Sequence, residues 1–126
     1  MKILIVDDEP LVRKSLGRAF RAKGHEVIEA VDGQEGLTRW LETNPDVVFV
    51  DVLMPGLSGP ELLKEIRPQL GDQWKGRVIL MSAYSGEHNV TTAQQLGADL
   101  FIPKPFEDIF ALVKRAEEIH GEVISQ

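Results

Sequence analysis

Residues 3–10 have the sequence ILIVDDEP, four apolar residues followed by three acids and a proline. A short run without a polar residue is typical of a β-strand that is buried on both faces of a sheet. Proline is favoured in the first turn of an α-helix, so Pro10 predicts that a helix begins directly after the acids. These eight residues therefore predict a buried strand, an acidic turn and a helix, in that order.

The same order of elements recurs along the chain. Further short apolar runs predict four more strands, at residues 27–30, 46–50, 78–81 and 100–102. Most runs are followed by a segment with apolar residues at helical spacing, although this pattern is thin at residues 88–96. Strands separated by helices pair in parallel, and right-handed crossovers place the helices on both faces of the sheet. We therefore predict an α/β fold with a doubly wound, five-stranded parallel sheet.

Local motifs predict where several helices begin and end. Asp32 with Glu35, and Ser58 with Glu61, have the spacing of capping boxes at helix N-termini. Pro68 is predicted to end the helix that Ser58 begins, because proline has no backbone N–H to donate to the preceding turn.

The composition limits the class of protein. The chain has 126 residues, which suits one domain, and 14 basic against 20 acidic residues give a net charge of −6. This acidic excess argues against direct binding of nucleic acid, and the absence of cysteine excludes disulfides, thiol nucleophiles and zinc-thiolate sites. The longest apolar runs are far too short to cross a membrane, and no signal-peptide pattern follows Met1. We expect a single acidic domain in the cytoplasm.

Polar side chains follow four of the predicted strands. In doubly wound sheets, ligands bind beyond the carboxyl ends of the strands, so these residues should meet at one edge. They are Asp7 and Asp8 after the first strand, Asp51 after the third, Ser82 after the fourth and Lys104 after the fifth.

This set of side chains suits phosphoryl chemistry. Three neighbouring carboxylates repel one another, and a hard cation with oxygen ligands such as Mg²⁺ relieves that repulsion. Lys104 and Ser82 would bind the oxygens of a phosphoryl group. A carboxylate that attacks phosphorus gives an aspartyl phosphate, a known type of covalent intermediate.

Several motifs in chain order resemble one family. They are residues 5–10 (IVDDEP), residues 51–55 (DVLMP) with Gly59, residues 81–83 (MSA), and residues 97–99 (GAD) followed by Phe101 and residues 104–106 (KPF). Over residues 1–126, with 121–126 as a short tail, the chain resembles a response-regulator receiver domain of two-component signal transduction, of the single-domain, chemotaxis-regulator-like kind. The resemblance implies a flavodoxin-like (βα)5 sandwich with strand order 2-1-3-4-5.

The resemblance also implies which residues react and hold the metal. Asp51 would accept a phosphoryl group from a histidine kinase or a histidine phosphotransfer protein. Asp8, Asp51 and the backbone carbonyl of Leu53 would hold Mg²⁺, and Asp7 would bind it through water.

Other residues would bind the phosphoryl group and transmit the signal. The resemblance implies that Lys104, Ser82 and the backbone of Ala83 contact its oxygens, and that the bond from Lys104 to Pro105 is cis. Ser82 and Phe101 would act as the switch that alters the face formed by the fourth helix, fifth strand and fifth helix, and so changes binding of a downstream protein effector. Such a domain is a signalling protein and not an enzyme, although it promotes its own phosphoryl transfer and dephosphorylation.

Alternatives follow from the same residues. A receiver-fold module that binds partners without phosphorylation keeps the same pattern, whereas Asp7 and Asp8 would repel the phosphate of a flavin carrier. An aspartyl-phosphate hydrolase would need two aspartates spaced two residues apart after the first strand, and the chain has no such pair there.

Two features have more than one interpretation. Phe101 fits a core residue as well as a switch. The first helix has five basic residues and no acid, which we interpret as a solvated face in preference to a docking surface: Arg13, Lys14, Arg18, Arg21 and Lys23.

Overall fold

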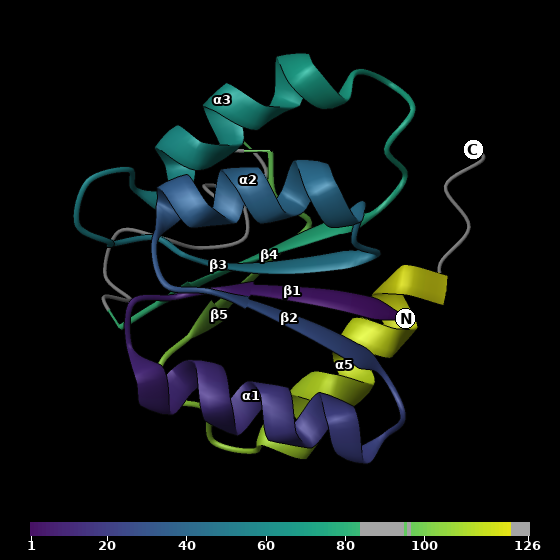
Figure 1. Cartoon of the computed structure of the whole chain (residues 1–126). Helices are drawn as coiled ribbons and strands as arrows, with labels where there is room; N and C mark the ends of the chain where they lie inside the picture. The colour runs from purple at the N-terminus through teal and green to yellow at the C-terminus, as the bar shows by residue number, and fades with distance from the viewer. Residues whose placement is uncertain (84–94, 96, 122–126) are drawn as a thin grey trace.

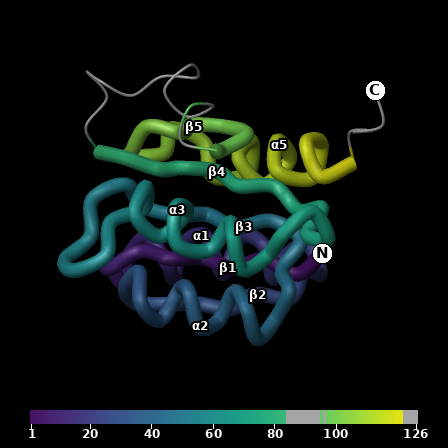
Figure 2. Tube along the Cα trace, turned by 90° about the horizontal axis from the view of Figure 1, so that it is seen from above, coloured from purple at the N-terminus to yellow at the C-terminus, as the bar shows by residue number. Residues whose placement is uncertain are grey.

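The computed structural model describes residues 1–83, 95 and 97–121, and its centre is a five-stranded parallel sheet. The spatial order is β2-β1-β3-β4-β5, and every neighbouring pair is parallel. Figure 2 shows the sheet from above, with β2 and β5 toward opposite edges. This arrangement confirms the predicted fold class and strand order. The strands are β1 (Lys2–Val6), β2 (Glu26–Ala30), β3 (Val47–Asp51), β4 (Arg77–Ser82) and β5 (Leu100–Pro103).

Helices cover both faces of the sheet (Figure 1). The four that the structure describes are α1 (Pro10–Ala22), α2 (Gly33–Thr43), α3 (Gly59–Leu70) and α5 (Ile109–Gly121). The first and last lie on one face, and α2 and α3 lie on the other. The helix predicted at residues 88–96 lies outside the described residues, apart from 95, as do residues 122–126. No helix in the described part of the chain is long and apolar enough to cross a membrane.

The core consists of two apolar layers, one on each face of the sheet. Leu4 and Val6 of β1 point into the layer under α2 and α3, whereas Ile3 and Ile5 point into the layer under α1 and α5. All four side chains are fully buried. Alternate residues of a strand face opposite sides, so a strand covered on both faces cannot carry a polar residue cheaply.

The N-termini of α2 and α3 follow the predicted motifs with one difference. Ser58 and Glu61 form the complete capping box, with N···O distances of 3.3 and 2.9 Å. In α2 the Asp32 carboxylate accepts a hydrogen bond from the Glu35 N–H at 2.8 Å. The Glu35 carboxylate, however, accepts from the N–H of Val31 at 3.0 Å, one residue before the predicted partner.

The prediction that Pro68 ends α3 is wrong. The helix continues to Leu70 and ends at Gly71, which has a φ of 63° and donates its N–H to Arg67. Proline removes one hydrogen bond to the preceding turn, and in the last turn of a helix that loss affects few others. The stronger stop signal is therefore the glycine.

Candidate functional site

The structure brings the predicted polar residues together at the carboxyl edge of the sheet. Asp7 directly follows β1, Asp51 and Ser82 are the last residues of β3 and β4, and Lys104 directly follows β5. Asp7, Asp51 and Ser82 are buried, with exposed fractions of 0%, 3% and 1%, whereas Asp8 is exposed. Buried polar groups are costly unless they have partners, so their presence together marks a site and not an ordinary turn.

Backbone hydrogen bonds fix the loops that hold these side chains. The Asp7 N–H donates to the carbonyl of Ala30 in β2, and the Asp7 carbonyl accepts a bond of 2.7 Å from the Arg13 guanidinium. The Lys104 N–H donates to the carbonyl of Ser82 at 2.8 Å, which ties the end of β5 to the end of β4. The bond from Lys104 to Pro105 is cis, as the resemblance implied.

Among the described residues, three carboxylates contact the ammonium of Lys104. Its Nζ atom lies 2.7 Å from Glu9, 3.1 Å from Asp7 and 3.5 Å from Asp51. Only 6% of the lysine side chain is exposed. Burial by itself would lower the pKa of Lys104, but the hydrogen bond to Glu9 and the charges of Asp51 and Asp7 outweigh it and raise that pKa. The lysine therefore stays positively charged.

The carboxylates form a cluster with the chemistry of a metal site. One oxygen from each of Asp7, Asp8 and Asp51 lies within 4.8 Å of the others. Burial, followed by the negative charge of Asp7, raises the pKa of Asp51 to about 6, and burial also raises the pKa of Asp7. Lys104 therefore does not fully neutralise the cluster. A set of oxygen ligands with surplus negative charge fits Mg²⁺.

Two other residues of the predicted set follow Asp51 and Ser82 closely in the chain. Leu53, two residues after Asp51, has an exposed side chain, and Ala83 directly follows Ser82 and lines a groove beside Lys104. Phe101 of β5 is half-buried and packs against the apolar layer under α2 and α3. Phe101 therefore lies on β5, next to the strand that ends at Ser82, and contributes to the core.

The structure shows a close backbone contact at Gly59 that the sequence did not explain. This glycine is the first residue of α3, and its N–H donates to the carbonyl of Val52. A Cβ atom at Gly59 would lie 2.5 Å from the carbonyl oxygen of Asp51, closer than real Cβ atoms approach. Glycine at this position thus lets α3 begin directly against the residue that carries the buried carboxylate.

The interpretation of the first helix as a solvated face is wrong for Arg13. Its side chain is buried, contacts the Asp7 carbonyl and lies 3.5 Å from Glu29 of β2. The same glutamate lies 3.2 Å from Lys14 and 3.4 Å from Arg21. An acid on the adjacent strand attracts the basic side chains to the sheet, a contact that the helix sequence alone does not reveal.

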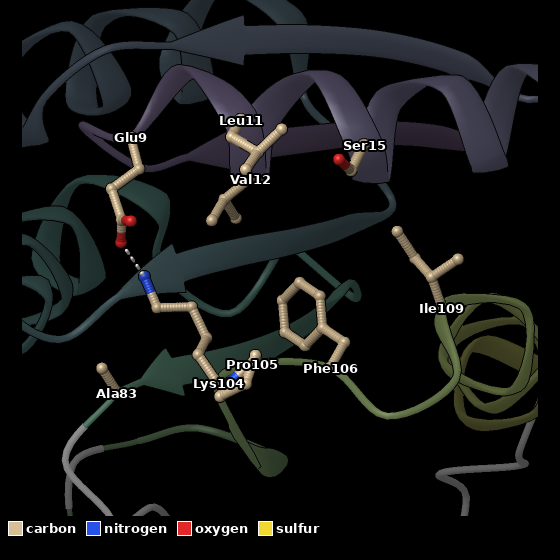
Figure 3. A pocket seen from close by; sticks show the side chains of 9 residues that line it. All are labelled: Glu9, Leu11, Val12, Ser15, Ala83, Lys104, Pro105, Phe106 and Ile109. Carbon is tan, nitrogen blue, oxygen red and sulfur yellow. Dashed lines mark hydrogen bonds and ion pairs between the residues drawn. The ribbon is translucent and has the colours of Figure 1, made fainter.

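An apolar groove lies between the start of α1 and the loop after β5. It adjoins the acidic pocket, which is formed by the carboxylate cluster and Lys104. The volume of the groove is about 530 Å³. Figure 3 shows the Glu9 carboxylate and the Lys104 ammonium meeting at one side of the groove, with Val12 and Phe106 beyond them. Leu11 is 78% exposed at its rim, so an apolar surface lies directly beside the acidic pocket.

The fold and the site define a flavodoxin-like α/β domain with an acidic, lysine-containing pocket at the carboxyl edge of its sheet. The family model described as "Response regulator receiver domain" matches residues 3–117. The chain therefore belongs to the receiver-domain family of two-component response regulators.

Known proteins with this domain include regulators that are longer than this chain. The regulatory protein AtoC of Escherichia coli is 37% identical over 122 residues, which cover 95% of this chain and 26% of the relative. The transcriptional regulatory protein ResD of Bacillus subtilis is 32% identical, over 93% of this chain and 50% of the relative. The chain thus spans half or less of the length of these curated relatives.

Solved receiver structures superpose closely. The receiver domain of Francisella response regulator 1452 has a TM-score of 0.83 and 31% identity, with 94% of this chain and 95% of the other covered. Response regulator TrrA of Thermotoga maritima, solved in complex with Mg(2+)-BeF, has a TM-score of 0.78 and 33% identity, with coverage of 94% and 97%.

The pKa of Asp51 predicts an unusual pH dependence of stability. A carboxyl group whose pKa rises from 3.8 to about 6 on folding takes up a proton on folding, so stability increases as the pH falls through 6. We expect the Mg²⁺-free Asp51→Asn variant to exceed the wild type by about 2 kcal/mol in free energy of unfolding above about pH 7. Urea denaturation in EDTA should show this difference shrinking toward about pH 5. A difference that does not change with pH would contradict the raised pKa.

Proposed function

We propose that this receiver domain is a phosphorylation-dependent switch in which Asp51 accepts the phosphoryl group. The observation that carries the proposal is the position of the Asp51 carboxylate, buried between two further aspartates and 3.5 Å from the Lys104 ammonium. With a pKa of about 6, most of this carboxylate is ionised at neutral pH and can act as a nucleophile.

The donor we propose is a phosphohistidine of a histidine kinase or a histidine phosphotransfer protein. A carboxylate oxygen of Asp51 attacks phosphorus, an O–P bond forms and the P–N bond to the imidazole breaks. The imidazole leaves with the bonding electron pair and takes up a proton. Lys104, the Ser82 hydroxyl and the backbone N–H of Ala83 would bind the phosphoryl oxygens, where negative charge is concentrated.

The acidic cluster would hold the metal that this transfer needs. We propose that Asp8, Asp51 and the carbonyl of Leu53 bind Mg²⁺, with Asp7 acting through water. When bound, the cation would offset charge on the carboxylates and the phosphoryl oxygens. The fit of this cluster to an oxygen-binding cation supports the proposal, as does the Mg(2+)-BeF complex of the related TrrA.

The response would pass through Ser82 and Phe101. The Ser82 hydroxyl would turn to the new oxygens, and Phe101 would repack, which would shift the face made by the fourth helix, β5 and α5. Phe101 has no hydroxyl, so its contribution rests on packing. Phe110, an exposed aromatic residue of α5, would offer an apolar contact to a downstream protein effector.

The apolar groove between α1 and the loop after β5 would bind the phosphoryl-donating partner. It lies beside the pocket, so a partner seated there brings its phosphohistidine to Asp51.

We propose that residues 1–126 form one cytoplasmic receiver domain, acting through protein contacts and not as an enzyme on other substrates. Its net charge of −6 supports the absence of direct contact with nucleic acid.

Incubation with Mg²⁺ and acetyl phosphate tests the function. We expect one phosphoryl group to be added per chain in intact-mass spectra, an adduct stable in acid and lost in base, as acyl phosphates are. Removal of Mg²⁺ with EDTA should prevent the labelling, because the carboxylate cluster then repels the anionic donor. If no donor, including phosphoramidate and a phosphorylated kinase, labels the protein, the chain acts instead as a phosphorylation-independent binding module.

A further inference from the structure

The side chain of Glu9 does not form the hydrogen bond that is common at its position, the start of α1. Glu9 is the N-cap residue of α1, a position where side chains commonly accept a hydrogen bond from the first helical turn. Its side chain makes no such bond. It reaches instead to Lys104, and its Oε1 atom lies 2.7 Å from the lysine Nζ (Figure 3).

Glu9 makes the closest of the three carboxylate contacts to Lys104. Asp7 and Asp51 lie farther away, at 3.1 and 3.5 Å, and both are buried. The Glu9 side chain is 58% exposed. Of the three acids, Glu9 can therefore leave the lysine at least cost, since water can solvate its carboxylate.

The backbone of Glu9 connects it to the same site. Its N–H donates to the Asp7 carboxylate at 2.9 Å, and its carbonyl accepts the first helical bond, from the Arg13 N–H. The start of the Glu9 side chain is therefore fixed relative to Asp7 and α1. Only the exposed end of the side chain must move for Lys104 to be released.

The Lys104 ammonium cannot bind the Glu9 carboxylate and a phosphoryl oxygen equally well. The proposed function requires this ammonium to bind a phosphoryl oxygen, and Glu9 occupies that ammonium before the phosphoryl group arrives. We propose that Glu9 is a latch on Lys104, a positioning residue that competes with the phosphoryl group and thereby lowers the affinity of the site for it. On phosphorylation Lys104 exchanges the Glu9 carboxylate for a phosphoryl oxygen, and Glu9 turns to solvent. This inference rests on the proposed function.

The affinity for beryllofluoride, a stable phosphoryl analogue, tests the latch. Titration calorimetry in saturating Mg²⁺ would compare the wild type with Glu9→Gln, Glu9→Asp and, as a matched control, Glu107→Gln, which removes an exposed acid from the loop after β5. We expect Glu9→Gln and Glu9→Asp to bind about fivefold more tightly, and Glu107→Gln to stay within about twofold of the wild type.

The aspartate variant separates a latch from a general effect of charge. Asp keeps the negative charge, but it is one methylene shorter and is a preferred N-cap, so its carboxylate turns to the helix and away from Lys104. Binding of Mg²⁺ alone should stay within about twofold in Glu9→Asp, since the charge near the metal ligands is retained.

The outcomes are distinguishable. If Glu9→Gln binds more tightly and Glu9→Asp matches the wild type, charge alone is responsible and the latch is wrong. If both variants match the wild type, Glu9 does not compete. If the wild type itself fails to bind beryllofluoride with Mg²⁺, the proposed function fails and the latch fails with it. Urea denaturation of each variant checks that the fold is retained.

Discussion

Asp51→Asn is expected to abolish the phosphoryl adduct completely. The amide nitrogen and oxygen of asparagine are poor nucleophiles, so this side chain cannot form the acyl phosphate that the carboxylate would form. Asp51 is the acid at the end of β3, the central strand of the sheet, where the Lys104 ammonium also contacts it. Intact-mass spectra after incubation with acetyl phosphate and Mg²⁺ should show only unmodified protein.

The controls separate loss of the nucleophile from loss of the fold. Asp72→Asn, which changes an exposed acid in the connection before β4, should be labelled like the wild type. Asp51→Asn should also be more stable than the wild type without Mg²⁺, because it removes one charge from a crowded buried cluster. Labelling of Asp51→Asn at full strength would show that another side chain receives the phosphoryl group.

The strands and the pocket were predictable because their signals are local. A strand buried on both faces is a short run of apolar residues, and the first polar residue after it marks the edge where ligands bind. Asp7, Asp51, Ser82 and Lys104 each stand at such a boundary, so parallel topology alone brings them to one edge. The chemistry of these four side chains is then the basis for the phosphoryl ligand that we propose.

What the sequence did not predict depends on pairs of residues that are distant in the chain. Glu29 attracts Arg13 across the space between β2 and α1, so a helix that looks solvated is partly buried. The Glu9 side chain does not cap α1 but contacts Lys104, which lies 95 positions away in the chain. Nothing within either segment encodes these partners, and the raised pKa of Asp51 similarly depends on burial and on Asp7.

Gly59 belongs to this second group, and its substitution should lower the stability of the fold strongly. A methyl group at this position would meet the carbonyl oxygen of Asp51 at 2.5 Å and the Cα of Val52 at 3.1 Å. Both are backbone atoms that β3 and its following turn hold by hydrogen bonds, so neither can rotate away as a side chain would. We expect Gly59→Ala to lower the free energy of unfolding by about 3 kcal/mol, at the upper end for an overpacked site.

The same contact should transmit the substitution to the chemistry. Relief of the overlap requires the start of α3 or the backbone of Asp51 to move, and small displacements of a reacting group slow a reaction strongly. In conditions where circular dichroism shows the variant folded, labelling by acetyl phosphate should be at least about tenfold slower. Gly121→Ala is the matched control, because a Cβ there meets no atom of the described residues within 4 Å, and it should change neither quantity. If Gly59→Ala unfolds at the same urea concentration as that control, α3 accommodates the methyl group freely. The glycine would then not be what sets the distance between α3 and the phosphoacceptor.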